Sequence, residues 1–116
     1  MILMCPVVTM LEYVHYPSKA RLLGKNPSND LVRLMSNELQ VSTETPPAFL
    51  AHCKDDGLVK PQNSMLFHEA LQRFGVRSEL RLYDKGGHGV RGPDRKFLWL
   101  KDGEKWLRAM RIVAAR

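Results

Sequence analysis

Residues 45–59 read TPPAFLAHCKDDGLV, and this stretch decides how the chain folds. Thr45-Pro46-Pro47 ends any preceding helix, because a residue before proline is pushed out of the helical region into extended backbone. Ala48–His52, AFLAH, is a short apolar run of the kind found in strands that are covered on both faces. The polar stretch HCKDDGLV, 52–59, would then follow the carboxyl end of a buried strand.

Two other segments predict strands. Met1–Val8 is apolar and bounded by turn-prone residues, and Ser78–Tyr83 alternates polar and apolar side chains. Helical patterns separate and follow the three segments, so the order is strand, helix, strand, helix, strand, helix. This order predicts an α/β fold of about three parallel strands with flanking helices. Functional groups in such sheets lie on loops at the carboxyl ends of strands, which here are HCKDDGLV and DKGGHGV, 84–90.

The first helix is predicted over about 29–37, with Ser28 as its N-cap. Its apolar face would consist of Leu31, Val32, Leu34 and Met35. The segment before it, 16–29, carries two prolines and a glycine and is predicted to be a loop.

The second helix is predicted over 62–74, with Pro61 in its first turn and Gly75 as its stop. The third helix is expected to start after an Asp102 cap. Its buried stripe would consist of Trp106, Met110 and Val113.

The net charge of +6 is localised, because residues 91–116 contribute +5 of it. A basic nucleic-acid-binding protein is therefore a weaker alternative for the function. Aromatic residues do not interleave with these charges as a base-stacking platform requires. A solvated helix face with its basic end at the helix C-terminus explains the pattern equally well, so we expect no nucleic-acid partner.

The composition leaves the compartment open. The apolar start, 1–11, has no basic segment before it and no small-residue cleavage site after it, so it is read as a strand rather than a signal peptide. No apolar run has the length of a membrane span, and no membrane contact is expected. Cys5 and Cys53 form no CxxC pair and are expected to be small buried apolar residues.

Two cofactor hypotheses find little support. GHGVRG, 87–92, matches GxGxxG, but Pro93 follows directly, and no helix opens from the glycines toward a second strand. A metal site would draw on residues that share no specific ligand spacing. These are His52, Cys53, Asp55, Asp56, His68 and His88. We therefore expect neither a metal nor an organic cofactor.

The remaining candidates are Asp56 and His88. A carboxylate on Nδ1–H fixes the tautomer of a proton-transferring histidine and stabilises the imidazolium that forms. Gly86, Gly87 and Gly89 surround His88 and permit a tight turn with close access for a substrate. On the residues alone, an ordinary acidic loop and a flexible glycine turn explain the pattern equally well.

Residues 45–90 resemble the C-terminal part of α/β-hydrolase-fold esterases, specifically acetyl-xylan-esterase-like and feruloyl-esterase-like carbohydrate esterases. MILMCPVVTM and LLGKNPSNDLVRLMSNELQV, upstream, resemble the preceding strand and cap-side insertion of that family. The family's D-x-x-V acid loop matches residues 56–59, which implies Asp56 as the triad acid with Asp55 in reserve. Its GGHG turn implies His88 as the triad histidine.

The sequence departs from this family at the nucleophile. The family's serine lies in G-x-S-x-G, before the acid and the histidine in the chain. None of the six serines has these flanking glycines, and no HGGG-type segment is present; they are Ser18, Ser28, Ser36, Ser42, Ser64 and Ser78. Residues 1–116 are therefore predicted to be one partial α/β-hydrolase domain without the N-terminal strands and nucleophile elbow.

The resemblance implies hydrolysis of acetyl or other acyl esters of carbohydrates, but negligible activity of this chain alone. The alternative is a truncated, non-catalytic hydrolase fragment that acts as an interaction module. In that reading the open edge of the strand at Met1–Val8 would pair two copies into a homo-oligomer. Members of the resembled family are often secreted, which leaves the localisation undecided.

Overall fold

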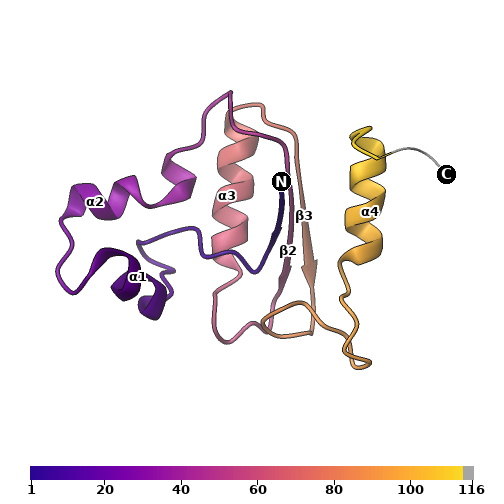
Figure 1. The fold of residues 1–116 in the computed structure, drawn as a ribbon, viewed down its shortest axis with the longest axis horizontal. Helices are drawn as coiled ribbons and strands as arrows, with labels where there is room; N and C mark the ends of the chain where they lie inside the picture. Colours follow the sequence, from indigo (N-terminus) through magenta and orange to yellow (C-terminus); the bar gives the residue numbers. More distant parts are fainter. Residues whose placement is uncertain (114–116) are drawn as a thin grey trace.

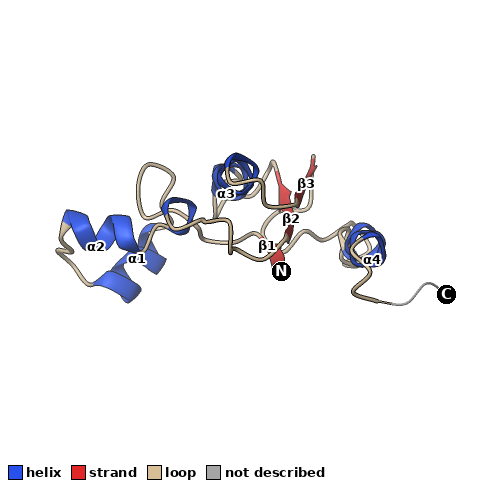
Figure 2. Cartoon of the chain, turned by 90° about the horizontal axis from the view of Figure 1, so that it is seen from above, coloured by secondary structure: helices blue, strands red, loops and turns tan. Residues whose placement is uncertain are grey.

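In a computed structural model, residues 1–113 are described and form an α/β sandwich (Figures 1 and 2). The strands are β1 (Ile2–Met4), β2 (Ala48–Cys53) and β3 (Ser78–Tyr83). The helices are α1 (Tyr16–Leu23), α2 (Asn29–Leu34), the 3-10 helix η1 (Asn37–Leu39), α3 (Gln62–Arg73) and α4 (Leu100–Ala109). The predicted α/β class is confirmed.

The sheet has the order β1-β2-β3, and both pairings are parallel. Leu3 is in register with Leu50, which in turn pairs with Leu80. Figure 2 shows α3 and α4 on opposite sides of this sheet, while α1 and α2 extend away from it beyond α3. Because the strands are parallel, the loops after β2 and β3 both lie at the carboxyl end of the sheet (Figure 1).

β2 is buried along its whole length, which explains its apolar sequence. Ala48 and Leu50 belong to the cluster under α3, whereas Phe49, Ala51 and Cys53 belong to the cluster under α4. This alternation follows from the two-residue period of a strand. Full burial of a side chain the size of Leu50 or Phe49 contributes about 1.5–3 kcal/mol.

Asn63 joins helix α3 to the segment after β1. Its Oδ1 accepts hydrogen bonds from the backbone N–H groups of Val8 (2.9 Å) and Thr9 (3.0 Å). Its Nδ2 donates to the carbonyl oxygens of Tyr13 (2.9 Å) and Lys60 (3.1 Å). One fully buried side chain thus binds four backbone groups, of which the Lys60 carbonyl oxygen also accepts from Asn63 N.

Several sequence predictions of the elements are confirmed. β3 has the predicted bounds, and β2 extends one residue further than predicted. Ser28 caps α2 by accepting a hydrogen bond from Leu31 N at 3.2 Å. Gly75 follows α3 with a φ of 69°, the left-handed conformation that ends many helices.

Three predictions in the first half of the chain are wrong. Residues 16–23 form helix α1 rather than a loop, because Pro17 lies in its first turn, where the missing N–H is tolerated. The first strand is limited to Ile2–Met4, since Cys5 takes a φ of 45° and ends the extended backbone. α2 is also shorter than predicted, and only Val32 of its expected apolar face is buried.

The last helix differs as well. α4 begins at Leu100, and Trp99 rather than Asp102 is its N-cap. Asp102 lies in the first turn and accepts a hydrogen bond from Tyr83 Oη at 2.6 Å, which ties α4 to β3. Trp106 is buried against Phe49 as predicted, with ring centroids 6.1 Å apart, but Val113 is exposed.

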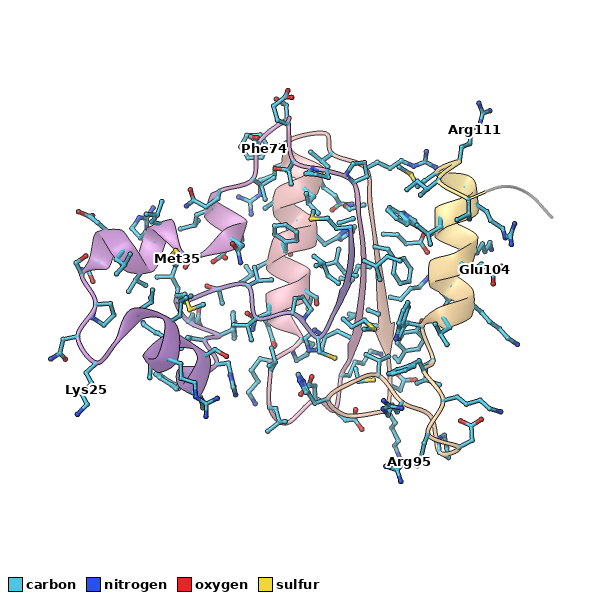
Figure 3. All side chains as sticks on the ribbon, in the orientation of Figure 1. Lys25, Met35, Phe74, Arg95, Glu104 and Arg111 are labelled. Atoms are coloured by element: carbon cyan, nitrogen blue, oxygen red, sulfur yellow. The ribbon has the colours of Figure 1, made fainter. Side chains whose placement is uncertain are left out.

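The excess of basic residues does not form one stripe. Figure 3 shows Lys25, Arg95 and Arg111 projecting from separate parts of the molecule. Lys96 lies 3.1 Å from Asp94, and Arg108 lies 2.6 Å from Glu104, so part of the basic charge is locally compensated. Among residues 1–113, no helix is both long enough and apolar enough to cross a membrane.

Candidate active site

The loops after β2 and β3 bring Asp56 and His88 together. His88 Nδ1 and Asp56 Oδ2 are 3.0 Å apart, although the residues are 32 positions apart in the chain. The Asp56 side chain is fully buried, whereas that of His88 is 42% exposed. The carboxylate therefore anchors one side of the imidazole, while part of the His88 side chain stays accessible. The sequence predicted this pair.

The environment of Asp56 favours its ionised form. Burial opposes ionisation, but hydrogen bonds from His88 and from the backbone N–H groups of Val59 and Leu58 outweigh it, so the pKa of Asp56 is lowered. Asp56 Oδ1 accepts from Leu58 N at 2.9 Å and from Val59 N at 3.0 Å. Because an ionised carboxylate only accepts hydrogen bonds, Nδ1 of His88 must carry the proton.

Asp55, the reserve acid, has a different position. Its Oδ1 accepts from Gly87 N at 2.9 Å, and its Oδ2 accepts from Gly86 N at 3.3 Å. These bonds join the two loops through the backbone of the glycine turn and make no contact with the imidazole. Of the two acids, Asp56 is the one hydrogen-bonded to His88.

The glycine turn is needed for close packing. A Cβ at Gly86 would lie 2.7 Å from Cys53 Sγ and 2.8 Å from the Arg91 carbonyl oxygen. Gly87 and Gly89 have φ values of 56° and 106°, which side chains disfavour. Val90 is fully buried with a φ of 54°, an uncommon conformation for a β-branched residue. The turn therefore has a specific backbone conformation that depends on its glycines.

His52 contacts Asp56, which the sequence did not predict. It is fully buried, and its Nε2 lies 3.2 Å from Asp56 Oδ2 and 2.9 Å from the Val59 carbonyl oxygen. Its Nδ1 lies 2.8 Å from Ser64 Oγ, on α3. The spacing of four residues from His52 to Asp56, across the end of a buried strand, was the signal available in the sequence.

Two of the six candidate metal ligands, His52 and Asp56, lie beside Cys5, which was not a candidate. Cys5, His52 and Asp56 place ligand atoms within 4.8 Å of one another, whereas His68 pairs with Ser78 at 2.9 Å instead. Burial raises the pKa of Cys5, so its thiol is protonated, and its sulfur accepts from Gly89 N at 3.3 Å. A metal would need a thiolate and an unprotonated nitrogen. Metal binding at this cluster would therefore have to release the proton of the Cys5 thiol.

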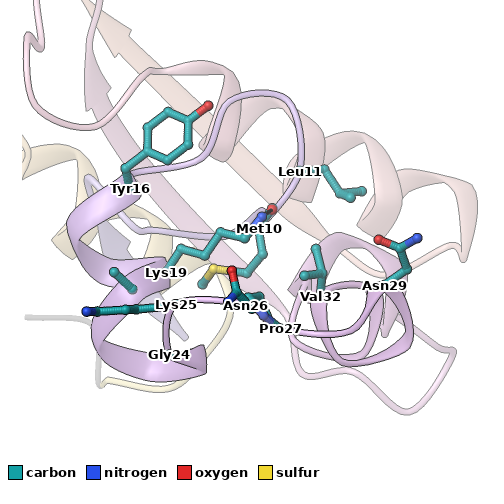
Figure 4. A pocket seen from close by; sticks show the side chains of 11 residues that line it. Met10, Leu11, Tyr16, Lys19, Gly24, Lys25, Asn26, Pro27, Asn29 and Val32 are labelled. Atoms are coloured by element: carbon teal, nitrogen blue, oxygen red, sulfur yellow. Dashed lines mark hydrogen bonds between the residues drawn. The ribbon is translucent and has the colours of Figure 1, made fainter.

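Two cavities are relevant to binding. A cavity of about 830 Å³ lies between α1 and α2 (Figure 4). Tyr16, Lys19 and Lys25 are among its lining residues, and neither Asp56 nor His88 is. A cavity of about 500 Å³ lies beside the glycine turn and is lined in part by Asp55, Gly86 and Gly87. Neither Asp56 nor His88 lines this second cavity, although their sequence neighbours Asp55 and Gly87 do.

Sequence comparison identifies the family. The model of the prolyl oligopeptidase family, Peptidase_S9, matches residues 1–111. The chain belongs to the prolyl oligopeptidase family. This prolyl oligopeptidase family chain is also 36% identical over 89 residues to endo-1,4-beta-xylanase B of Butyrivibrio fibrisolvens.

Two solved structures are also similar to this chain. An acetyl ester-xyloside bifunctional hydrolase from Caldicellulosiruptor lactoaceticus is 38% identical, with a TM-score of 0.88. A carboxylesterase from Lactobacillus plantarum shares the fold at 23% identity, with a TM-score of 0.80. The predicted resemblance to α/β-hydrolase-fold esterases is confirmed, and the three parallel strands with flanking helices match these neighbours.

The chain covers only part of each relative. It matches 97% of its own length but 43% of the Caldicellulosiruptor hydrolase, and 99% of its own length but 46% of the Lactobacillus carboxylesterase. For the Butyrivibrio xylanase the shares are 77% of this chain and 14% of the relative. The prolyl oligopeptidase family chain thus spans less than half the length of these proteins.

Proposed function

We propose that Asp56 and His88 are the acid and the general base of a serine-dependent carboxylic ester hydrolase. The observation that carries the proposal is the hydrogen bond between His88 Nδ1 and the buried, ionised carboxylate of Asp56, at 3.0 Å. This arrangement fixes the tautomer and the orientation of a proton-transferring imidazole. The exposed part of the ring is left to meet a nucleophile and a substrate.

In the proposed reaction, Nε2 of His88 takes the proton of a serine hydroxyl while the serine oxygen attacks the acyl carbon of the ester. The proton then passes from Nε2 to the leaving alcohol, and an acyl-serine remains. Water then attacks the acyl carbon while Nε2 takes its proton, and this proton passes to the serine oxygen as the acyl–serine bond breaks and the carboxylic acid leaves. Asp56 stays ionised throughout and stabilises the imidazolium.

The proposed source of the serine is a segment other than these 116 residues, because they contain no G-x-S-x-G sequence. For the same reason we propose that the chain by itself has negligible esterase activity. An oxyanion hole is also needed, and one lost donor in such a site lowers the rate by about 10²–10³-fold.

The proposed substrates are acetyl or other acyl esters of carbohydrates. Two relatives support this class: the Caldicellulosiruptor protein is named an acetyl ester-xyloside hydrolase, and the Butyrivibrio protein is named a xylanase. Both are more than 35% identical to this chain over the matched residues, which is closer than the carboxylesterase at 23%.

The test is a chimera in which this chain replaces the matching part of the Caldicellulosiruptor hydrolase. We expect the chimera to release 4-nitrophenol from 4-nitrophenyl acetate. His88→Ala should lower kcat by about 10⁶-fold, because the general base is lost. His68→Ala, a matched histidine away from Asp56, should retain the activity. An active chimera that tolerates His88→Ala would contradict the proposal.

As a second candidate function, we propose self-association through the edge of β1. Within residues 1–113, β1 is hydrogen-bonded to β2 only, and Met4 is 41% exposed. An unpaired strand edge is a template for a further strand. The occupant we propose is β1 of a second copy.

A further inference from the structure

His52 lies at the centre of a buried polar network that links α3 to the acid loop. Its side chain has no exposed surface. Nδ1 faces Ser64 Oγ at 2.8 Å, and Nε2 faces the Val59 carbonyl oxygen at 2.9 Å and Asp56 Oδ2 at 3.2 Å. The hydrogen-bonding neighbours of this imidazole are thus a residue of α3 and the 56–59 turn, and Cys5 Sγ lies within 4.8 Å.

The partners determine the tautomer of His52. A carbonyl oxygen and an ionised carboxylate only accept hydrogen bonds, so Nε2 must be protonated. Burial lowers the pKa of His52, so the ring is neutral and Nδ1 is unprotonated. Ser64 Oγ–H, a hydroxyl that can donate, therefore donates to Nδ1. The serine on α3 thereby directs the proton of His52 toward the acid loop.

Hydrogen-bond donors approach both oxygens of the Asp56 carboxylate. Leu58 N and Val59 N donate to Oδ1, while His88 Nδ1 and the Nε2 proton of His52 approach Oδ2. The same Nε2 proton also holds the carbonyl oxygen of Val59, whose N–H group binds Oδ1. His52 therefore fixes both the carboxylate and the turn that carries it.

We propose that His52 is a positioning residue for Asp56, which keeps Oδ2 aimed at His88 Nδ1. The inference rests on the proposed function of the Asp56–His88 pair. A positioning role differs from ordinary core packing, since it depends on the N–H donor at Nε2. Core packing depends only on the volume of the ring.

Two amide substitutions separate these roles. His52→Gln places an amide N–H near the position of Nε2 and retains the donor to Val59 and Asp56. His52→Asn places its amide near Nδ1 and loses that donor. His68→Gln is the matched control, because His68 also pairs with a serine, Ser78, at 2.9 Å but has no contact with Asp56.

The readout is the tautomer of His88 in the purified chain, from the ¹⁵N chemical shifts of its ring nitrogens at a pH where the ring is neutral. We expect Nδ1–H to be the major form in the wild type, in His52→Gln and in His68→Gln. In His52→Asn we expect Nε2–H, the form that free imidazole favours, to become the major one. Retention of Nδ1–H in a folded His52→Asn variant would overturn the inference.

The wild type alone provides a second test, which holds even where His52→Asn does not fold. His52 itself should be neutral and protonated at Nε2; a protonated Nδ1 on His52 would overturn the inference. Failure of the inference about His52 is distinguishable from failure of the proposed function. If wild-type His88 is not protonated at Nδ1, the acid–histidine pair itself is wrong. If it is, and His52→Asn has no effect, only the role of His52 is wrong.

Discussion

Gly86 lies at a point where a side chain does not fit, between Cys53 and the backbone of Arg91. We expect Gly86→Ala to lower the free energy of unfolding by roughly 2–4 kcal/mol, because the new Cβ would meet Cys53 Sγ at 2.7 Å and the φ of 144° disfavours a side chain. Gly57→Ala is the control, since nothing lies within 4 Å of its added Cβ. Urea denaturation of both variants checks this; equal losses would contradict it.

The pKa of His52 predicts a loss of stability in acid. Burial lowers the folded-state pKa, so below the ordinary value of about 6.5 the unfolded state binds the extra proton. Stability due to His52 is therefore complete above about pH 6.5 and falls as the pH is lowered, by up to about 1.4 kcal/mol per pH unit. The lowered pKa of His68, also caused by burial, acts in the same direction.

His52→Gln should reduce the slope of the unfolding free energy against pH by the contribution of one proton. His68→Gln should reduce the same slope independently. The lowered pKa of Asp56 acts at lower pH: its contribution is present above about 3.8 and is lost as the pH falls through the folded value. Urea denaturation at several values between about pH 5 and pH 7 measures the slope. An unchanged slope in His52→Gln would contradict the assignment of a neutral His52.

Single residues also show where sequence reasoning succeeds. The residues alone left the pairing of Asp56 with His88 open, and the resemblance to the esterase family favoured it and preferred Asp56 to Asp55. The role of His52 did not follow, because only the folded turn brings Val59 and Asp56 to its Nε2. The bonds of Asp55 to the glycine turn depend likewise on backbone N–H directions that the sequence does not display.

At the scale of elements, Asn63 joins α3 to the segment after β1. We expect Asn63→Ala to destabilise the fold by about 3 kcal/mol or more, because Val8 N, Thr9 N and the Tyr13 carbonyl oxygen would lose buried partners. Gln72→Ala, an exposed residue of the same helix, should change stability by about 0.5 kcal/mol or less. Equal effects in thermal unfolding would contradict this role for Asn63.

The free edge of β1 gives a prediction for assembly. Met1 O and Cys5 N bond to β2, so in this parallel strand Met4 N–H points to the other side. Met4→Pro should therefore block pairing at the edge without removing a β1–β2 hydrogen bond. Light scattering should show a dimer for the wild type and a monomer for Met4→Pro. A wild type that stays monomeric at high concentration would contradict self-association.

Elements were predictable where local pattern and tertiary burial agree. β3 and the Ser28 cap were found because alternation and capping are local signals. α1 was missed because its proline was taken for a break, although proline is tolerated in a first turn. The start of α4 was misplaced because Asp102, a good cap residue by type, instead binds Tyr83 on the sheet.

At the scale of the whole molecule, the acid–histidine pair lies on loops at the carboxyl end of a three-stranded sheet, and a cavity of about 500 Å³ lies beside the glycine turn. It covers 43% of the Caldicellulosiruptor hydrolase, with a TM-score of 0.88. That agreement of backbone makes a chimera practical, since the matched part can be replaced as a unit. The order of strands and helices predicted the fold class, and the family resemblance implied part of a larger hydrolase, which the comparisons confirm.

The central claim is that Asp56, and not its neighbour Asp55, is the acid partner of His88. The most direct measurement is kcat for 4-nitrophenyl acetate in the chimera with Asp56→Ala and with Asp55→Ala. We predict a loss of about 10³–10⁴-fold for Asp56→Ala, because the tautomer and the imidazolium lose their support. Asp55→Ala should lose about 10-fold or less, since only two backbone bonds of the turn are removed. The reverse order of the two losses would contradict the account.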